Sequence, residues 1–149
     1  MAHEHEDALE LQHSWQAFNY ACDSYTRRAG VSNAMLQIIS LLYRHPRITQ
    51  KEMCEMSLLP KQTVNKAVTT LLRKGLVDMK EVAEDRRAKV VSLTPLGRRH
   101  ARHVVESLNE LETKALSQFS DEQRKDFIEM MKAITKTINA ADAPAGLDL

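Results

Sequence analysis

The side chains best suited to bind another molecule are concentrated between Pro60 and Lys89. Amides, hydroxyls and cations recur there on one side of a helical repeat, at Gln62, Asn65, Lys66, Thr69 and Arg73. A side-chain amide can exchange two hydrogen bonds with an adenine edge, and a lysine can bind guanine or a phosphate. These residue types predict contacts with duplex DNA, and a solvated polar helix face is the alternative interpretation.

A second group of cations follows at Arg86, Arg87 and Lys89. Cations at the tip of a hairpin suit the narrow, electronegative minor groove of A·T-rich DNA. Lys51 and Arg73 are further candidates for phosphate contacts that carry no sequence information.

The elements that would position these groups are a helix, two strands and the start of another helix. One buried stripe of the helix is predicted at Val64, Val68, Leu71 and Leu72. Lys74 and Gly75 are expected to end the helix, because glycine readily adopts the left-handed conformation of helix ends. Residues 76–82 then alternate as a half-buried strand does, residues 84–87 form the expected turn, and residues 89–93 return as a second strand. Thr94 and Pro95 suit the cap and the first position of the next helix.

The chain before this region predicts three helices. Residues 1–7 show no periodicity and are expected to be irregular, whereas an aromatic-rich stripe follows at Leu11, Trp15, Phe18, Cys22 and Tyr25. The helix after Ser32 is apolar almost all round and is therefore central. Thr49 and Glu52 have the spacing of a capping box, which starts a short helix with Met53 and Met56 expected to face inward.

The chain after Thr94 predicts two long helices with more apolar surface than a small lobe can cover. The first carries its stripe at Ala101, Val104, Val105, Leu108, Leu111, Ala115, Leu116 and Phe119. Ser120 and Gln123 form a second capping box, and the last helix presents Phe127, Met131, Ile134 and Ile138. These stripes, with that of the first helix, predict a homodimer.

Composition limits the class of protein. The 149 residues are 43% hydrophobic and 28% charged, as in an ordinary globular domain, and no apolar run exceeds three residues, so that a cytoplasmic protein without membrane contact is expected. The net charge is only +1, but residues 44–103 carry 14 Lys or Arg and 6 Asp or Glu, whereas the remaining residues carry 7 and 14. The basic block is typical of a surface that meets phosphates.

At this point the residues support a family resemblance. Asp85, Arg86 and Arg87, followed by residues 91–97 (VSLTPLG), match the D-x-R wing and the L-T-x-x-G junction of the MarR family of bacterial regulators. Residues 32–100 resemble that family, and the helix order of the whole chain is similar. The implied fold is mainly α with a small β-hairpin wing and about six helices. It would be a single domain, with a winged helix-turn-helix lobe at 32–97, called the winged lobe below, and a helical dimerisation region at 8–29 and 100–141.

The resemblance implies a dimer whose recognition helices enter successive major grooves of a pseudo-palindromic operator, with Arg87 in the minor groove. The expected DNA-binding residues are Lys51, Pro60, Lys61, Gln62, Thr63, Asn65, Lys66, Thr69, Arg73, Arg86, Arg87 and Lys89. Asp85 is expected to support the wing by bonding backbone amides or an arginine. Pro60 departs from the family, which commonly has a serine before the recognition helix.

Several signals could regulate such a protein. A small aromatic or amphipathic effector is expected near Trp15, Phe18, Met35 and Tyr43. Cys22 lies near tyrosines and suggests redox sensing, but its place on the apolar stripe favours a buried structural thiol. His100 and His103 suggest zinc, although the lack of a second local ligand pair favours no metal.

The sequence thus predicts a dimeric transcription regulator, a repressor by family analogy, released by a small molecule or an oxidative signal. The alternative is a winged-helix module that binds proteins without reading DNA sequence. An enzyme is not expected, because the chain has no Gly-rich phosphate loop, no G-x-S-x-G and no H-E-x-x-H. No cofactor is predicted.

Overall fold

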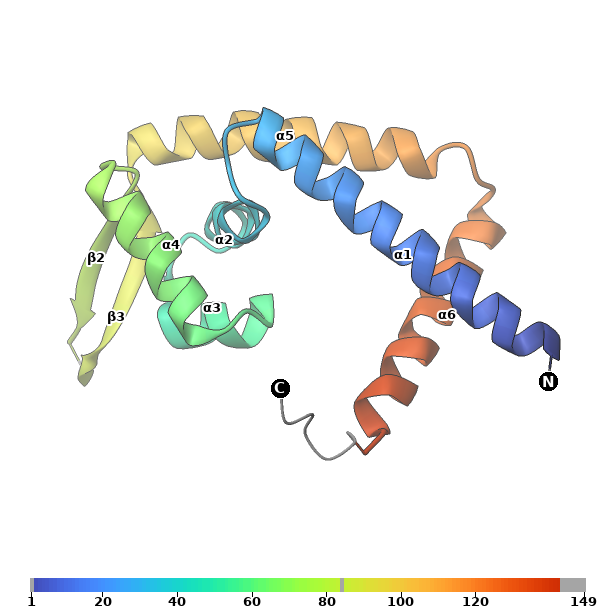
Figure 1. The fold of residues 1–149 in the computed structure, drawn as a ribbon. Coiled ribbons are helices and arrows are strands. Elements are labelled where there is room, and N and C mark those ends of the chain that lie inside the picture. The colour runs from blue at the N-terminus through green and yellow to red at the C-terminus, as the bar shows by residue number, and fades with distance from the viewer. Residues whose placement is uncertain (1, 84, 143–149) are drawn as a thin grey trace. The chain divides into compact units, whose positions relative to one another are not determined.

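The computed structural model describes residues 2–83 and 85–142, except for the side chains of residues 2 and 85–87. Within them the chain forms six helices and a three-stranded antiparallel sheet (Figure 1), which confirms the predicted fold class. The helices are α1 (Ala2–Arg28), α2 (Asn33–Arg44), α3 (Gln50–Ser57), α4 (Lys61–Arg73), α5 (Pro95–Leu116) and α6 (Asp121–Ala140). The strands are β1 (Ile48–Thr49), β2 (Val77–Val82) and β3 (Asp85–Leu93). No helix of the described residues is long and apolar enough to cross a membrane.

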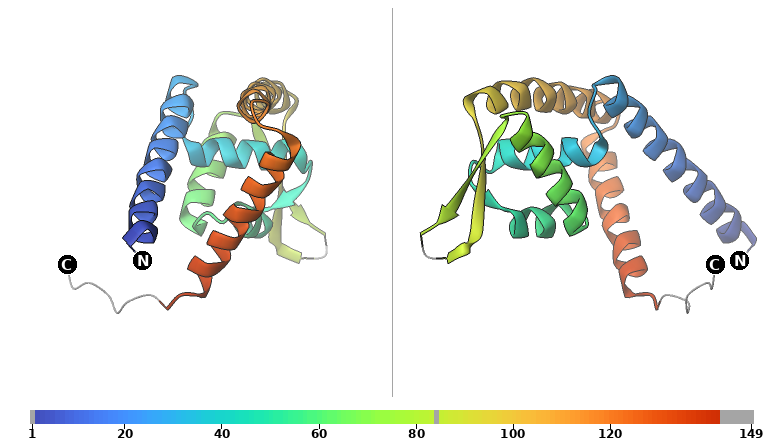
Figure 2. Two further views of the ribbon diagram at one scale, coloured as in Figure 1. Left: turned by 90° about the vertical axis from the view of Figure 1, so that its right-hand side faces the viewer. Right: turned by 60° about the vertical axis from the view of Figure 1, so that its left-hand side comes forward.

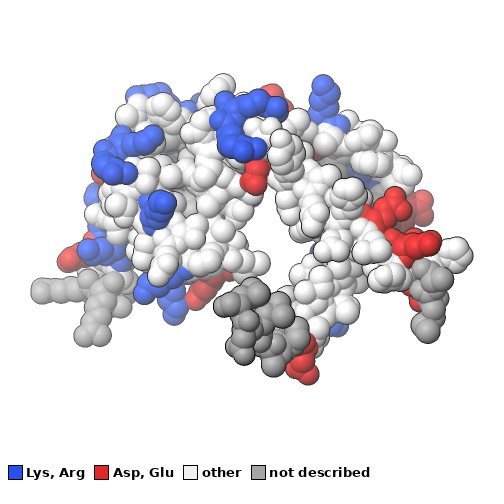
Figure 3. Space-filling view, viewed as in Figure 1, with Lys and Arg blue, Asp and Glu red and all other residues white. Residues whose placement is uncertain are grey.

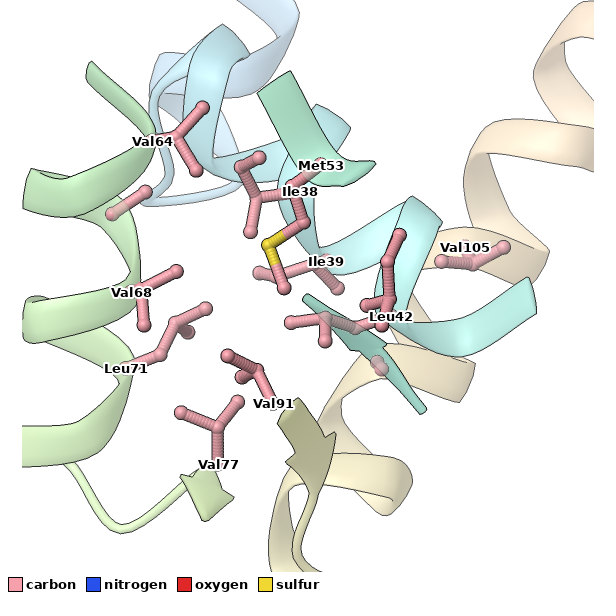
Figure 4. Packing of buried hydrophobic residues seen from close by; sticks show 13 residues of the cluster. Ile38, Ile39, Leu42, Met53, Val64, Val68, Leu71, Val77, Val91 and Val105 are labelled. Carbon is pink, nitrogen blue, oxygen red and sulfur yellow. The ribbon is translucent and has the colours of Figure 1, made fainter. Parts of the chain in front are cut away.

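The chain divides into two compact units, residues 1–107 and 108–149. The first holds the core of the winged lobe, where α2 lies against α3 and α4. Side chains from α2, α3, α4, the sheet and the start of α5 meet in one cluster (Figure 4). Its fully buried members include Ile38, Leu42, Met53, Val64, Val68, Val77, Val91 and Val105. The prediction that α2 is central is confirmed.

Two expectations about helix faces are wrong. Met56 is 50% exposed rather than inward, and Leu72 is 36% exposed. Ala67 is buried on α4 with Val64, Val68 and Leu71. The buried stripe of α4 therefore ends one position earlier, because Leu72 lies past the edge of the surface that α2 and the sheet cover.

Two expected boundaries are also wrong. The first helix begins at Ala2, so most of the segment expected to be irregular is helical. The second wing strand begins at Asp85 rather than at Lys89, and Asp85 pairs with Val82. The strand is longer because its ladder with β2 includes a final pair at Asp85, on the far side of residues 86–88.

The sheet has the order β1-β3-β2, with a short strand that the sequence did not predict. β1 pairs with β3 only through Ile48 with Val91 and Thr49 with Val90. The β2–β3 hairpin extends beyond the helices of the winged lobe (Figure 2). Its ladder runs from Val77 opposite Leu93 to Val82 opposite Asp85, with a register shift between Glu81 and Val82. This shift leaves residues 86–88 as extra residues on β3, between the partners of Glu81 and Val82.

The junction after β3 fastens the end of the hairpin to the end of α4. The amide of Gly75, whose φ is +66°, and the amide of Leu76 donate to carbonyls of the last turn of α4. Thr94 donates its amide to the carbonyl of Leu76 (3.0 Å) and its hydroxyl to the carbonyl of Gly75 (2.8 Å). The same hydroxyl accepts from the amide of Gly97 at 3.0 Å, which confirms Thr94 as the cap of α5.

Both predicted capping boxes are present. The Thr49 hydroxyl accepts from the amide of Glu52, and the Ser120 hydroxyl accepts from the amide of Gln123. In return, the side chains of Glu52 and Gln123 accept from the amides of Thr49 and Ser120. Because the bond donors lie three residues away on the same chain, these helix starts depend on local sequence alone.

The capping box at Thr49 predicts a pH-dependent contribution to stability. The amide of Thr49 (2.7 Å) and its hydroxyl (2.8 Å) donate to the Glu52 carboxylate, and these bonds hold the pKa of Glu52 below its ordinary value of 4.5. A lowered folded-state pKa stabilises the fold above pH 4.5 and loses this effect as the pH falls through the lowered pKa. We expect Glu52→Gln to lower the unfolding temperature at pH 7 and to lower it less at pH 3. A difference that is the same at both pH values would contradict this account.

Candidate nucleic-acid interface

The outward face of α4 carries most of the polar side chains that the sequence predicted to bind DNA. The hydrophobic residues Val64, Ala67, Val68 and Leu71 turn the opposite face into the core. The exposed residues are Lys61, Gln62, Asn65, Lys66, Thr69 and Arg73, and Thr63 is half-buried. No residue of α4 is acidic. The helix therefore presents amides, a hydroxyl and cations to solvent without a carboxylate that would repel phosphates.

The start of α4 has no side-chain cap. Pro60 is the N-cap residue, and its carbonyl accepts from the amides of Thr63 and Val64. Helix N-termini attract anions, because their first amides lack intrahelical partners and the helix dipole is positive there. Because Pro60 has no side chain that can cap the helix, the amides of Lys61 and Gln62 have no side-chain acceptor at this end of α4.

The other predicted contact residues flank α4. Lys51 is exposed on α3, with its ammonium 4.0 Å from the carboxylate of Glu55. Lys89 is exposed on β3, opposite Glu81 of β2. The backbones of Asp85, Arg86 and Arg87 belong to β3, but their side chains lie outside the described residues. The roles assigned to these three side chains stay predictions.

Lys and Arg side chains lie over α4 and the start of α5 (Figure 3), in line with the basic block of the sequence. On α5 the exposed cations Arg99 and Arg102 lie near the half-buried Arg98, whose guanidinium is 5.9 Å from the centre of the Tyr43 ring. The acidic residues Glu4, Glu6, Asp7 and Glu10 belong to the first turns of α1. The charge is therefore segregated along the helices as well as along the sequence.

The residues predicted to hold an effector lie in different surroundings. Trp15 and Phe18 are exposed on α1 with their rings 6.3 Å apart, whereas Met35 and Tyr43 are half-buried on α2 and pack against the core. Met35 lines a hollow of about 400 Å³ with Ser32, Gln62, Thr63, Lys66 and Thr70. Cys22 is a half-buried free thiol on α1. Within the described part of the chain, no group of three or more His, Cys, Asp or Glu side chains could hold a metal.

A second hollow, of about 360 Å³, combines residues that sequence reasoning did not connect. Its walls come from the end of α1, the start of α2 and α5, and its lining includes Tyr25, Arg28, Leu36, His103 and Val104. A phenol, a guanidinium and an imidazole line this hollow together with apolar side chains. The only sequence signal was the pair of histidines on α5, because Tyr25 and Arg28 lie 78 and 75 positions before His103 in the chain.

Comparisons with known proteins agree with this geometry. A family model described as "MarR family" matches residues 29–88. The HTH-type transcriptional regulator BilQ of Clostridium symbiosum is 22% identical over 123 residues, which are 83% of this chain and 85% of that protein.

Solved structures are similar over most of the chain. NMB1585, a MarR family regulator from Neisseria meningitidis, is 26% identical, with a TM-score of 0.71 over 87% of this chain and 94% of that chain. MepR of S. aureus, in a complex with DNA, shares the fold at 20% identity, with a TM-score of 0.74 over 88% of this chain and 96% of that chain. The family model, the relative and the shared winged fold together support a MarR-family transcriptional regulator.

Proposed function

We propose that this regulator binds a pseudo-palindromic operator as a homodimer. In each protomer α4 would enter a major groove and the β2–β3 hairpin would reach the adjacent minor groove. The observation that carries the proposal is the outward face of α4, where exposed amides and cations occur without any acidic residue. A helix of this kind fits the major groove of B-DNA, and its amides can pair with adenine edges. The DNA complex of S. aureus MepR supports the proposal through the shared fold.

Duplexes selected by the purified chain from a random-sequence pool provide the test. If Lys66 binds a phosphate, Lys66→Ala should weaken binding to all duplexes and lower the slope of log K against log salt by about one. Asn65→Ala should instead relax the preference at one base pair. Lys136→Ala, which removes an exposed cation of α6, is the matched control and should leave binding unchanged. Weak, salt-insensitive binding of every duplex would favour the alternative, a winged-helix module that binds proteins.

The proposed dimer depends on apolar side chains of α1 and α6. Every residue from His3 to Ala21 is exposed, including Leu9, Leu11, Trp15 and Phe18. On α6 the exposed apolar residues are Phe127, Ile128, Met130, Ile134 and Ile138. Rows of exposed apolar side chains on a helix are uncommon on a monomer and are typical of an interface. We therefore assign residues 8–29 and 100–141 to dimerisation and the winged lobe, residues 32–97, to DNA binding.

Light scattering at micromolar concentration should give the mass of two chains. Ile134→Glu should give a single chain, because a carboxylate buried in an apolar interface lacks a partner. Lys132→Glu changes an exposed charge on the same helix and should leave the dimer intact. A single-chain mass for the unaltered protein would contradict the dimer.

We also propose that the protein is a repressor released by a small aromatic acid. The hollow at Tyr25, Arg28 and His103 has the size of a small-ligand pocket and combines apolar walls with a cation. Calorimetry with a panel of hydroxybenzoic acids would identify a ligand, and Arg28→Ala should abolish its binding. Arg27→Ala is the control, since Arg27 lies over the Tyr20 ring at 5.9 Å. Operator and effector should weaken each other's binding by the same factor, and equal ligand affinity with and without operator would exclude this mechanism.

A further inference from the structure

Leu58, in the turn between α3 and α4, has a backbone conformation that leucine rarely adopts. Its φ of 57° and ψ of 19° are left-handed, and it is the one non-glycine residue with a positive φ in the described ranges. A side chain with a Cβ atom raises the energy of this conformation, so that glycine or asparagine usually occupies it. Leucine at this position therefore costs stability.

The Leu58 side chain contributes little to the fold in return. It is 88% exposed, more than any other large apolar side chain that the structure describes. The turn itself is held by the backbone, since the amide of Leu58 donates to the carbonyl of Cys54 at 3.1 Å. The next residue, Leu59, packs against the core. Glycine or asparagine at position 58 would form the same turn.

The surroundings of Leu58 indicate what its side chain could contact. Met56, 50% exposed, lies two residues before it and the exposed Pro60 lies two residues after it; these three exposed apolar residues are called the apolar tip. The apolar tip leads directly into the uncapped first turn of α4, where Lys61 and Gln62 are exposed. It therefore directly precedes the proposed DNA-binding face in the chain.

DNA offers apolar atoms beside a helix that enters the major groove. They are the C5 methyl group of thymine and the carbon atoms of deoxyribose, and apolar side chains contact the thymine methyl in known complexes. A leucine at this place would bury its methyl groups only when the duplex is bound. The energy of its strained conformation would be offset in the complex rather than in the free protein.

We propose that Leu58 is a DNA-contacting residue, whose side chain packs against thymine methyl or deoxyribose carbons at the edge of the groove that α4 enters. This inference rests on the proposed function, because it assumes that α4 binds the operator.

The decisive variant is Leu58→Asn, because asparagine tolerates the left-handed backbone but has no apolar surface. We expect its unfolding temperature to rise by about 2–4 °C, since the strain is relieved. Its dissociation constant for a duplex selected by the unaltered chain should increase about three- to tenfold, as expected when a few buried carbons are lost. A variant that is more stable than the unaltered protein but binds DNA more weakly would show that Leu58 contacts DNA and does not stabilise the fold.

Two further variants control the comparison. Leu58→Met keeps an apolar side chain and should bind within about twofold of the unaltered protein. Leu96→Asn changes another exposed leucine, 42% accessible in the first turn of α5, and should also leave the affinity unchanged. Replacement of each thymine by uracil distinguishes the two DNA groups. If Leu58 contacts a thymine methyl group, one replacement should weaken binding by the unaltered protein but not by Leu58→Asn. If it contacts deoxyribose, Leu58→Asn should lose the same affinity on every duplex.

The inference is overturned if Leu58→Asn binds the duplex as tightly as the unaltered chain, or if its unfolding temperature falls. The proposed function stands in both cases, provided that Lys66→Ala weakens binding. If the unaltered protein selects no duplex at all, the proposed function and this inference fail together.

Discussion

Gly97→Ala should lower the free energy of unfolding by about 3 kcal/mol, because the added methyl group has no room against the backbone. A Cβ atom at position 97 would lie 1.8 Å from the carbonyl oxygen of Leu76 and 2.8 Å from its carbonyl carbon. That oxygen also accepts from the amide of Thr94, so the residue cannot move without loss of the bond that joins the end of α4 to the start of α5. Urea unfolding followed by circular dichroism measures the difference.

Gly75→Ala is the matched control for this prediction. Gly75 has a φ of +66° and open space around it, so that alanine there meets backbone strain but no clash. We expect a loss of about 1 kcal/mol, the usual cost of a left-handed alanine. If the two variants were equally destabilised, the close approach at Leu76 would not be the cause.

Arg87→Ala should weaken operator binding by about 1–3 kcal/mol, the range for one good specific contact. The loss should be largest where the flanking minor groove is A·T-rich, because a narrow groove concentrates negative potential. The backbone of Arg87 belongs to the extra residues that the register shift adds to β3. Fluorescence anisotropy at several salt concentrations measures the effect.

Asp85→Ala distinguishes support of the wing from a simple charge effect. Asp85 begins β3 opposite Val82, at the last pair of the hairpin ladder. If its carboxylate holds the turn or an arginine in place, the variant should bind DNA more weakly although the wing becomes more positive. Tighter binding by Asp85→Ala would show that the aspartate has no supporting role.

Features set by neighbouring residues in the chain could be predicted from the sequence. Thr49 with Glu52, Ser120 with Gln123, and Thr94 before Pro95 all mark helix starts, because their hydrogen bonds span three residues. The outward face of α4 was also predictable, since the helical repeat separates its polar residues from Val64 and Val68.

Features set by distant partners could not be predicted in this way. Periodicity places Met56 and Leu72 on apolar stripes, but only the extent of the neighbouring elements decides that both are exposed. β1 is two residues long and exists because β3 offers a free edge at Val90 and Val91. The hollow at Arg28 and His103 requires α1 and α5 to meet, which no local pattern encodes.

The short length of β1 also affects how the protein behaves at high concentration. Because β1 covers β3 only at Val90 and Val91, the stretch from Asp85 to Lys89 has a strand neighbour on one side alone in the described structure. An open strand edge is a template for intermolecular pairing and aggregation, and charged residues along it are the usual protection. Lys89 is an exposed cation on this stretch, and we expect its replacement by an apolar residue to favour edge-to-edge pairing of separate molecules.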